Sequence, residues 1–143
     1  MTKLLIDTDV VLDILLDRHP HVEGSAAVWA IVERRKAQGW IAAHSVTTVH
    51  YLVRRERNGA EARRTIESLL SVLDVALVDS AIIQNALRLS MVDFEDAVTA
   101  AAAQAVGCDY IVTRNTKDYT RSPIQSMMPE SMVAVLSRLP GLS

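Results

Sequence analysis

The sequence contains few of the residues that cross-link or interrupt a fold. Its single cysteine, Cys108, cannot form an internal disulfide or supply a set of thiolates for zinc. With only five glycines and four prolines, the chain is unlike a collagen, linker or disordered segment. No apolar run approaches the roughly 18 to 20 residues needed to span a bilayer, and Asp7 breaks the N-terminal one before it could form a signal peptide. We therefore expect a soluble protein of the reducing cytoplasm that does not associate with membranes.

Size and charge narrow the possible classes further. The chain has 143 residues, of which 50% are hydrophobic, and this suits one globular domain spanning 1–143. The net charge of −2 lacks the basic excess of a general polyanion binder. The positions of the charges, rather than their sum, must therefore indicate a function.

Short apolar segments alternate with stretches of helical periodicity along the chain. The predicted strands cover residues 3–6, 40–43, 73–78, 110–113 and 124–128. The predicted helices begin near Val10 and then cover residues 22–37, 45–57, 60–71, 80–87, 97–106 and 129–139, with Ser45 and Ser80 as expected N-caps. Strands that are apolar throughout are typical of a parallel sheet buried on both faces. The pattern predicts an α/β fold with three layers, in which helices flank a parallel sheet of four to five strands.

Acidic side chains cluster where the predicted strands end or a helix begins. Asp7 and Asp9 follow the first strand, Asp118 comes soon after the fourth, and Asp93 and Asp96 open a helix. Any one of them could be a turn residue or a helix cap. Together at one sheet edge, however, carboxylates repel one another unless a cation joins them. We predict Mg²⁺ or Mn²⁺ bound by Asp7, Asp96 and Asp118, in a site for phosphodiester hydrolysis.

Three segments resemble the motifs of PIN domains, and the resemblance extends over roughly the whole chain. They are residues 4–12 (LLIDTDVVL), residues 94–97 (FEDA) before an alanine-rich stretch, and residues 110–119 (YIVTRNTKDY). The resemblance implies a Rossmann-like sheet and a metal-dependent endoribonuclease acting on single-stranded RNA. Many such proteins are VapC-type toxins that form homodimers and have a cognate antitoxin protein. It also implies a catalytic set of Asp7, Asp96, Asp118 and Asn115.

This sequence departs from the pattern of PIN domains at two positions. His50 stands where the family usually has a glutamate, and Asn115 stands where it often has an aspartate. His50 could be a neutral metal ligand or a structural side chain on a helix. Asp9 stands where the family often has an asparagine, and we expect it to lie behind the metal ligands and to fix the turn after the first strand. The remaining accessory candidates are Ser45, Asp93 and Thr113, which also suit capping or strand-end roles.

Arginines are concentrated in a second region of the chain. Arg54, Arg55 and Arg57, followed by Arg63 and Arg64, could contact a phosphate backbone. They could equally form a solvated helix face paired with nearby glutamates. With six aromatic residues, the sequence shows no stacking platform for bases. Trp29 could belong to the core or to a dimer contact.

Two other functions compete with hydrolysis of RNA. The segment from Asp7 to Val11 also resembles haloacid-dehalogenase-like phosphatases, in which Asp7 would be the nucleophile. That chemistry expects a lysine before an acidic pair, but no lysine occurs between Lys36 and Lys117. The loss of acids at His50 and Asn115 also suits a catalytically weakened binding module.

Overall fold

Five parallel strands form one sheet in the order β3-β2-β1-β4-β5. The computed structural model describes residues 1–139. The strands are β1 (Lys3–Ile6), β2 (Gln38–Ala42), β3 (Asp74–Ala76), β4 (Tyr110–Val112) and β5 (Gln125–Met127). The helices are α1 (Thr8–Leu15), α2 (Val22–Glu33), α3 (Ala43–Glu56), α4 (Gly59–Val72), α5 (Ser80–Arg88), α6 (Phe94–Ala105) and α7 (Pro129–Leu136), with a short 3-10 helix η1 (Thr116–Tyr119). The predicted α/β class and parallel sheet are confirmed.

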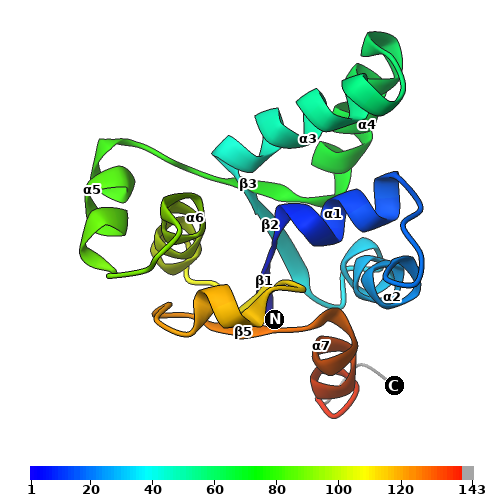
Figure 1. Ribbon diagram of the computed structural model, residues 1–143. Helices are drawn as coiled ribbons and strands as arrows, with labels where there is room; N and C mark the ends of the chain where they lie inside the picture. Colours follow the sequence, from blue (N-terminus) through cyan, green and yellow to red (C-terminus); the bar gives the residue numbers. More distant parts are fainter. Residues whose placement is uncertain (140–143) are drawn as a thin grey trace.

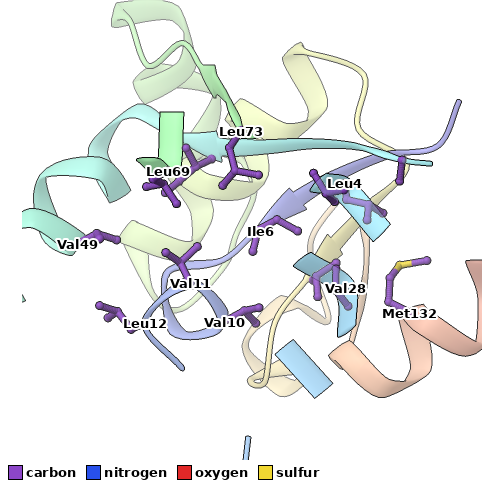
Figure 2. Close-up of a cluster of buried hydrophobic side chains, with 14 of the residues drawn as sticks. Leu4, Ile6, Val10, Val11, Leu12, Val28, Val49, Leu69, Leu73 and Met132 are labelled. Atoms are coloured by element: carbon purple, nitrogen blue, oxygen red, sulfur yellow. The ribbon is translucent and has the colours of Figure 1, made fainter. Parts of the chain in front are cut away.

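Alternation along β1 divides the core between the two faces of the sheet. Leu4 and Ile6 pack into a cluster with side chains of α1 to α4 and α7, whereas Leu5 packs on the other face with α5 and α6. Figure 1 shows α1 and α2 on one side of the sheet and α5 and α6 on the other. Figure 2 shows Leu4, Ile6 and Val28 within the larger cluster. Trp29 packs against this cluster while remaining partly exposed, in agreement with the core interpretation.

The alanine-rich face of α6 explains how this helix lies so close to the sheet. Its alanines from Ala100 to Ala103 are at most 2% exposed and pack against Leu5 and Ile111. Small side chains bring the helix axis near the strands. Gly107, with φ 77°, ends the segment in the left-handed conformation that glycine adopts without strain. The first turn of α6 is thereby held over the sheet.

Several predicted boundaries were wrong. The helix predicted for 22–37 ends at Glu33, because Arg35 has a φ of 60° and turns the chain toward β2. The strand predicted for 73–78 covers only Asp74–Ala76, and its first two residues are exposed because β3 is an edge strand with one neighbour. The last helix ends at Leu136 rather than at 139.

Two predicted helix caps were also wrong. The third helix begins at Ala43 after Ala42, which makes no side-chain capping bond, and Ser45 is buried inside its first turn. Asp79, rather than Ser80, caps α5 by accepting a hydrogen bond from the Ile82 amide. Both serines have capping chemistry, but the chain enters each helix before them.

None of the helices within residues 1–139 has the length and apolarity needed to cross a membrane.

Candidate functional site

Asp7 lies where β1 ends and α1 begins, at the carboxyl edge of the sheet. Its Oδ1 accepts a hydrogen bond from the Thr8 amide at 2.8 Å, which caps α1. Its Oδ2 accepts from the Thr113 hydroxyl at 2.9 Å and from the Tyr119 hydroxyl at 3.2 Å. These donors are all neutral, and the side chain is 9% exposed. Burial and the charge of Asp9 raise the pKa of Asp7 to about 6.

Asp96 reaches the same point from the first turn of α6. The Tyr119 hydroxyl lies 3.3 Å from Asp96 Oδ1, so a single hydroxyl group separates the carboxylates of Asp7 and Asp96. Burial, followed by repulsion from Asp7 and Asp93, raises the pKa of Asp96 to about 7. A hydroxyl has one proton and cannot donate to both acids at once. Ionising both carboxyls together is therefore unfavourable unless a cation joins the pair.

Asp9 fixes the turn that follows β4. Its Oδ2 accepts hydrogen bonds from the Arg114 amide and from Asn115 Nδ2, both at 3.1 Å. The Thr113 hydroxyl in turn accepts from the Asn115 amide at 3.1 Å. Asp9 Oδ1 is buried without a hydrogen-bond partner within the described residues. Asp9 thus supports the 113–115 turn, a partner segment that the sequence analysis did not identify.

Arg114 holds this turn against α1 from the opposite side. Its Nε and Nη2 donate to the two carboxylate oxygens of Asp13 at 2.6 and 3.1 Å. Asp13 is fully buried and also accepts from the Ser25 hydroxyl at 3.3 Å. Such a two-point contact fixes the guanidinium plane. The turn carrying Asn115 is therefore anchored on two aspartates of α1.

Asp118 lies in η1 with an exposed side chain, one residue before Tyr119. Its negative charge contributes to the raised pKa of Asp96. Across residues 1–139, however, no group of three or more His, Cys, Asp or Glu side chains is arranged to hold a metal ion. The structure therefore brings Asp7 and Asp96 together and leaves Asp118 outside a three-carboxylate cluster.

The chemistry of the remaining pair suits a hard cation. Mg²⁺ is commonly bound by one or two carboxylates, together with water and phosphate oxygens, and Mn²⁺ also accepts oxygen ligands. Asp7 and Asp96 supply such oxygens, and their mutual repulsion would be relieved by a positive charge between them. The residues present therefore fit a divalent ion with two protein ligands.

The other candidates lie around this pair or away from it. Asp93 caps α6 by accepting a hydrogen bond from the Asp96 amide at 3.0 Å. His50 is partly exposed on α3, and no hydrogen bond joins it to the acids in the described structure. Arg55 lies 5.9 Å from the ring centre of Tyr51 and pairs with Glu56 at 3.7 Å.

Arg54 and Arg57 are exposed near the end of α3. Arg63 pairs with Glu67 at 3.6 Å along α4, as the solvated-face interpretation expects. The arginine cluster is therefore partly engaged in local ion pairs.

The sequence reasoning missed a polar chain behind Asp96. His44 Nε2 lies 3.2 Å from the Thr99 hydroxyl, and that hydroxyl donates to the Glu95 carbonyl at 3.1 Å. If the Thr99 hydroxyl donates to that carbonyl, Nε2 is the donor in the His44 contact; the buried Nδ1 has no hydrogen-bond partner within residues 1–139. Burial also lowers the pKa of His44. The signal available in the sequence was the position of His44 directly after the second strand.

The hydroxyl of Tyr119 was missed for a different reason. The aromatic residue after Asp118 belongs to the motif, but its sequence position does not reveal that its hydroxyl reaches two acids from other elements. The pairing of Arg114 with Asp13 likewise joins residues 101 positions apart. Neither contact leaves a local pattern in the sequence.

Comparison with solved structures finds the same fold in several toxin–antitoxin proteins. VapBC2 from Rickettsia felis, bound to a DNA fragment from its promoter, has 14% identity and a TM-score of 0.70, covering 89% of this chain and 98% of the other. DNA-bound VapBC from Salmonella typhimurium has 17% identity and a TM-score of 0.70, covering 90% and 99%. VapC20 from Mycobacterium tuberculosis, a toxin that cleaves the sarcin-ricin loop, has 16% identity and a TM-score of 0.62, covering 76% and 86%.

No curated protein matches the chain in sequence. The sequence model described as "PIN domain" matches residues 3–117, a stretch that contains Asp7, Asp9, Asp96 and the 113–115 turn. With its acids placed at the carboxyl edge of a parallel sheet, the chain belongs to the PIN domain family.

Proposed function

We propose that this protein is a metal-dependent endoribonuclease that hydrolyses single-stranded RNA. The observation that carries the proposal is the pairing of Asp7 and Asp96 around one hydroxyl, with the pKa of each raised. Two carboxylates that resist ionising together form a ready site for a divalent cation. Membership of the PIN domain family supports nuclease chemistry at this site.

Each residue around the pair has a separate task in this proposal. Asp7 and Asp96 would hold Mg²⁺ or Mn²⁺, while Thr113 and Tyr119 orient the Asp7 carboxylate by hydrogen bonding. When bound, the ion would lower the pKa of a water molecule and stabilise charge developing on the phosphate. Asn115, whose amide nitrogen is engaged by Asp9, keeps its amide oxygen available to substrate or water.

Asp118 would act beside the pair rather than within it. Its carboxylate is exposed next to the motif and could accept a contact once substrate is bound. Asp118→Asn should therefore lower cleavage less than Asp7→Asn does. Equal losses in the two variants would make Asp118 a full metal ligand instead.

The decisive experiment measures cleavage of a labelled single-stranded RNA with Mg²⁺, with Mn²⁺ and with EDTA. The double variant Asp7→Asn and Asp96→Asn should lose at least about 100-fold in rate, because both ion ligands lose their charge. Asp17→Asn is the matched control, since Asp17 is exposed outside the site. Metal-dependent cleavage that survives in the double variant would contradict the proposal.

Two other functions give distinguishable results in this experiment. RNA binding without cleavage under every metal condition would identify a binding module, which His50 and Asn115 in place of acids favour. A phosphatase would release phosphate from small monoesters. No structural observation favours that activity: Asp9, which would be the acid paired with the nucleophile Asp7, accepts hydrogen bonds from the 113–115 turn instead.

We also propose that the protein pairs with a cognate antitoxin and forms a homodimer. The similar structures include toxin–antitoxin complexes, and apolar side chains are exposed on and beside edge strand β3 and on α5. Val75 is 42%, Leu77 63% and Leu87 69% exposed. Leu77→Glu and Leu87→Glu should each weaken an assembly seen by light scattering, whereas Tyr51→Glu, exposed on α3, should not.

A further inference from the structure

A cavity of about 420 Å³ opens between the residues that precede α6 and those of η1 and its C-terminal continuation. One wall is the connection between α5 and α6, with Met91 and Val92, and the other is η1 and the residues that follow it, with Lys117 and Arg121. Figure 1 shows these two segments approaching each other below α6. The volume falls within the range of small-ligand sites, about 300 to 1,000 Å³.

The shape of the cavity is held by a specific contact across its walls. Arg121 Nη1 donates to the Ser90 carbonyl at 3.2 Å. Ser90 has a φ of 57°, a left-handed conformation that a serine adopts only where its surroundings hold it. The connection between α5 and α6 is therefore fixed against the segment after η1.

Each wall of the cavity includes a residue from the segments that position the carboxylate pair. Asp93, which lines the cavity, accepts the hydrogen bond of the Asp96 amide. On the other wall, Asp118 lines the cavity and precedes Tyr119, whose hydroxyl reaches both acids. A polymer whose phosphate lies at Asp7 and Asp96 would thus place its neighbouring unit at this opening.

The lining combines cationic and apolar side chains. Lys117 and Arg121 are exposed, and neither forms a salt bridge with any residue from 1 to 139. Arg121 uses one N–H group on Ser90 and retains others for a ligand. Val92 is 100% exposed, and Met91 is partly buried beside it. Lys117 and Arg121 can attract a phosphate, and the flat face of a base can pack on the apolar side chains of Met91 and Val92.

We propose that this cavity is the subsite for the nucleotide next to the cleaved phosphodiester in single-stranded RNA. Lys117 and Arg121 contact that nucleotide's phosphates, and its base packs on Met91 and Val92. The inference rests on the proposed ribonuclease function. It favours single strands because paired bases in a duplex have no free face to present.

The subsite also differs from the arginine cluster on α3. Arg55 already contacts Tyr51 and Glu56, and none of the α3 arginines lines the cavity that contains Asp93 and Asp118. Lys117 and Arg121 belong to the segment that carries Asp118 and Tyr119. Substrate affinity should therefore depend more on these two cations than on those of α3.

The test measures steady-state cleavage of a fluorescent single-stranded RNA by the full chain. Lys117→Gln and Arg121→Gln should each raise KM roughly fivefold with little change in kcat, as expected for loss of an exposed charge contact. The slope of log affinity against log salt should fall by about 0.7 for each contact removed. Lys36→Gln and Arg34→Gln, exposed on the connection before β2, are the matched controls and should change neither quantity.

Two further variants separate binding from loop structure. Arg121→Lys keeps the positive charge and should recover much of the affinity that Arg121→Gln loses. Val92→Ser should raise KM for intact RNA, but should have little further effect on RNA that is abasic at the subsite position, located by scanning the abasic site along the strand. Abasic RNA that binds the wild-type protein as well as intact RNA would overturn the base contact.

The nucleotide subsite and the ribonuclease function can be contradicted by different results. If the wild-type protein cleaves RNA and the Lys117 and Arg121 variants behave like Lys36→Gln and Arg34→Gln, the subsite is wrong and the nuclease function stands. If a duplex of the same sequence competes as well as the single strand, the subsite is also wrong. If the wild-type protein neither binds nor cleaves single-stranded RNA with either metal, both proposals are overturned.

Discussion

Two buried carboxylates lie at the start and towards the end of helix α1, and they are treated in opposite ways. Asp13 is fully buried and receives two hydrogen bonds from the Arg114 guanidinium. Asp7 is 9% exposed and receives hydrogen bonds only from neutral donors, with the acids Asp9 and Asp96 nearby. A buried charge without a counter-charge is costly. The contrast marks Asp13 as part of the architecture and Asp7 as part of a site.

The largest expected effect comes from removing the counter-charge of Asp13. Arg114→Met leaves that carboxylate buried with only the Ser25 hydroxyl, so the free energy of unfolding should fall by about 3–5 kcal/mol. Urea denaturation at pH 7 measures the loss. Adding Asp13→Leu to the variant should recover much of it, because the uncompensated charge is then gone.

Arg63→Met is the matched control, since it breaks the exposed pair with Glu67. It should cost less than about 1 kcal/mol. Similar losses in the Arg114 and Arg63 variants would mean that burial of Asp13 does not determine the stability of the turn.

At the Asp7–Asp96 pair, which lacks a counter-charge, removing a carboxylate should raise the free energy of unfolding. Asp96→Asn should stabilise the protein in EDTA at pH 8, because the folded state then no longer has to ionise a carboxyl whose pKa is raised to about 7. The side chain is partly exposed and water screens some of the repulsion, so we expect a gain of about 1–2 kcal/mol. The free energy of unfolding, measured against pH in urea, gives the comparison.

The pH dependence follows from the direction of the shift. A raised pKa favours the protonated folded state, so wild-type stability is full below the ordinary value of 3.8 and is lost as the pH rises through 7. The gap between Asp96→Asn and the wild type should therefore open across that window and then stay constant. Asp13→Asn, under the same conditions, should destabilise the protein. A gap that does not change with pH would contradict a raised pKa of Asp96, and with it the burial and repulsion that cause the shift.

Tyr119→Phe tests the hydroxyl that separates the two acids. Its hydrogen bonds favour the ionised forms of Asp7 and Asp96, so without it their repulsion is less well compensated. In EDTA at pH 8 the loss should be about 1 kcal/mol, the usual net value of a hydrogen bond. If the divalent ion takes over this role, saturating Mg²⁺ or Mn²⁺ should reduce the difference. A loss unaffected by metal would assign the hydroxyl to packing alone.

The sequence was sufficient to predict the class of fold and the pair of acids Asp7 and Asp96, but not the pairing of Asp13 with Arg114. Apolar runs located every strand, and the rule that ligands lie at the carboxyl edge brought Asp7 and Asp96 together. The exposure of β3 was not predictable, because strand order is a tertiary property that the run 73–78 does not encode.

The same limit applies to the counter-charges. Nothing in the sequence around Asp13 indicates that its partner is Arg114. Likewise, nothing around Asp118 indicates that its side chain lies outside the pair formed by Asp7 and Asp96. Chain position places residues on an edge, and side-chain packing then decides which charges meet.

The smallest expected effect comes from matched losses of a neutral donor. Ser25→Ala removes a 3.3 Å hydrogen bond from Asp13, which keeps both contacts to Arg114, so unfolding should become easier by less than about 1 kcal/mol. Thr113→Val removes a 2.9 Å bond from Asp7, which has no cation to compensate, and also the acceptor of the Asn115 amide, so it should cost more. Urea denaturation of both variants in EDTA at pH 8 measures the difference. Equal costs would mean that Arg114 does not buffer Asp13, and the distinction between the two carboxylates would then rest on burial rather than on pairing.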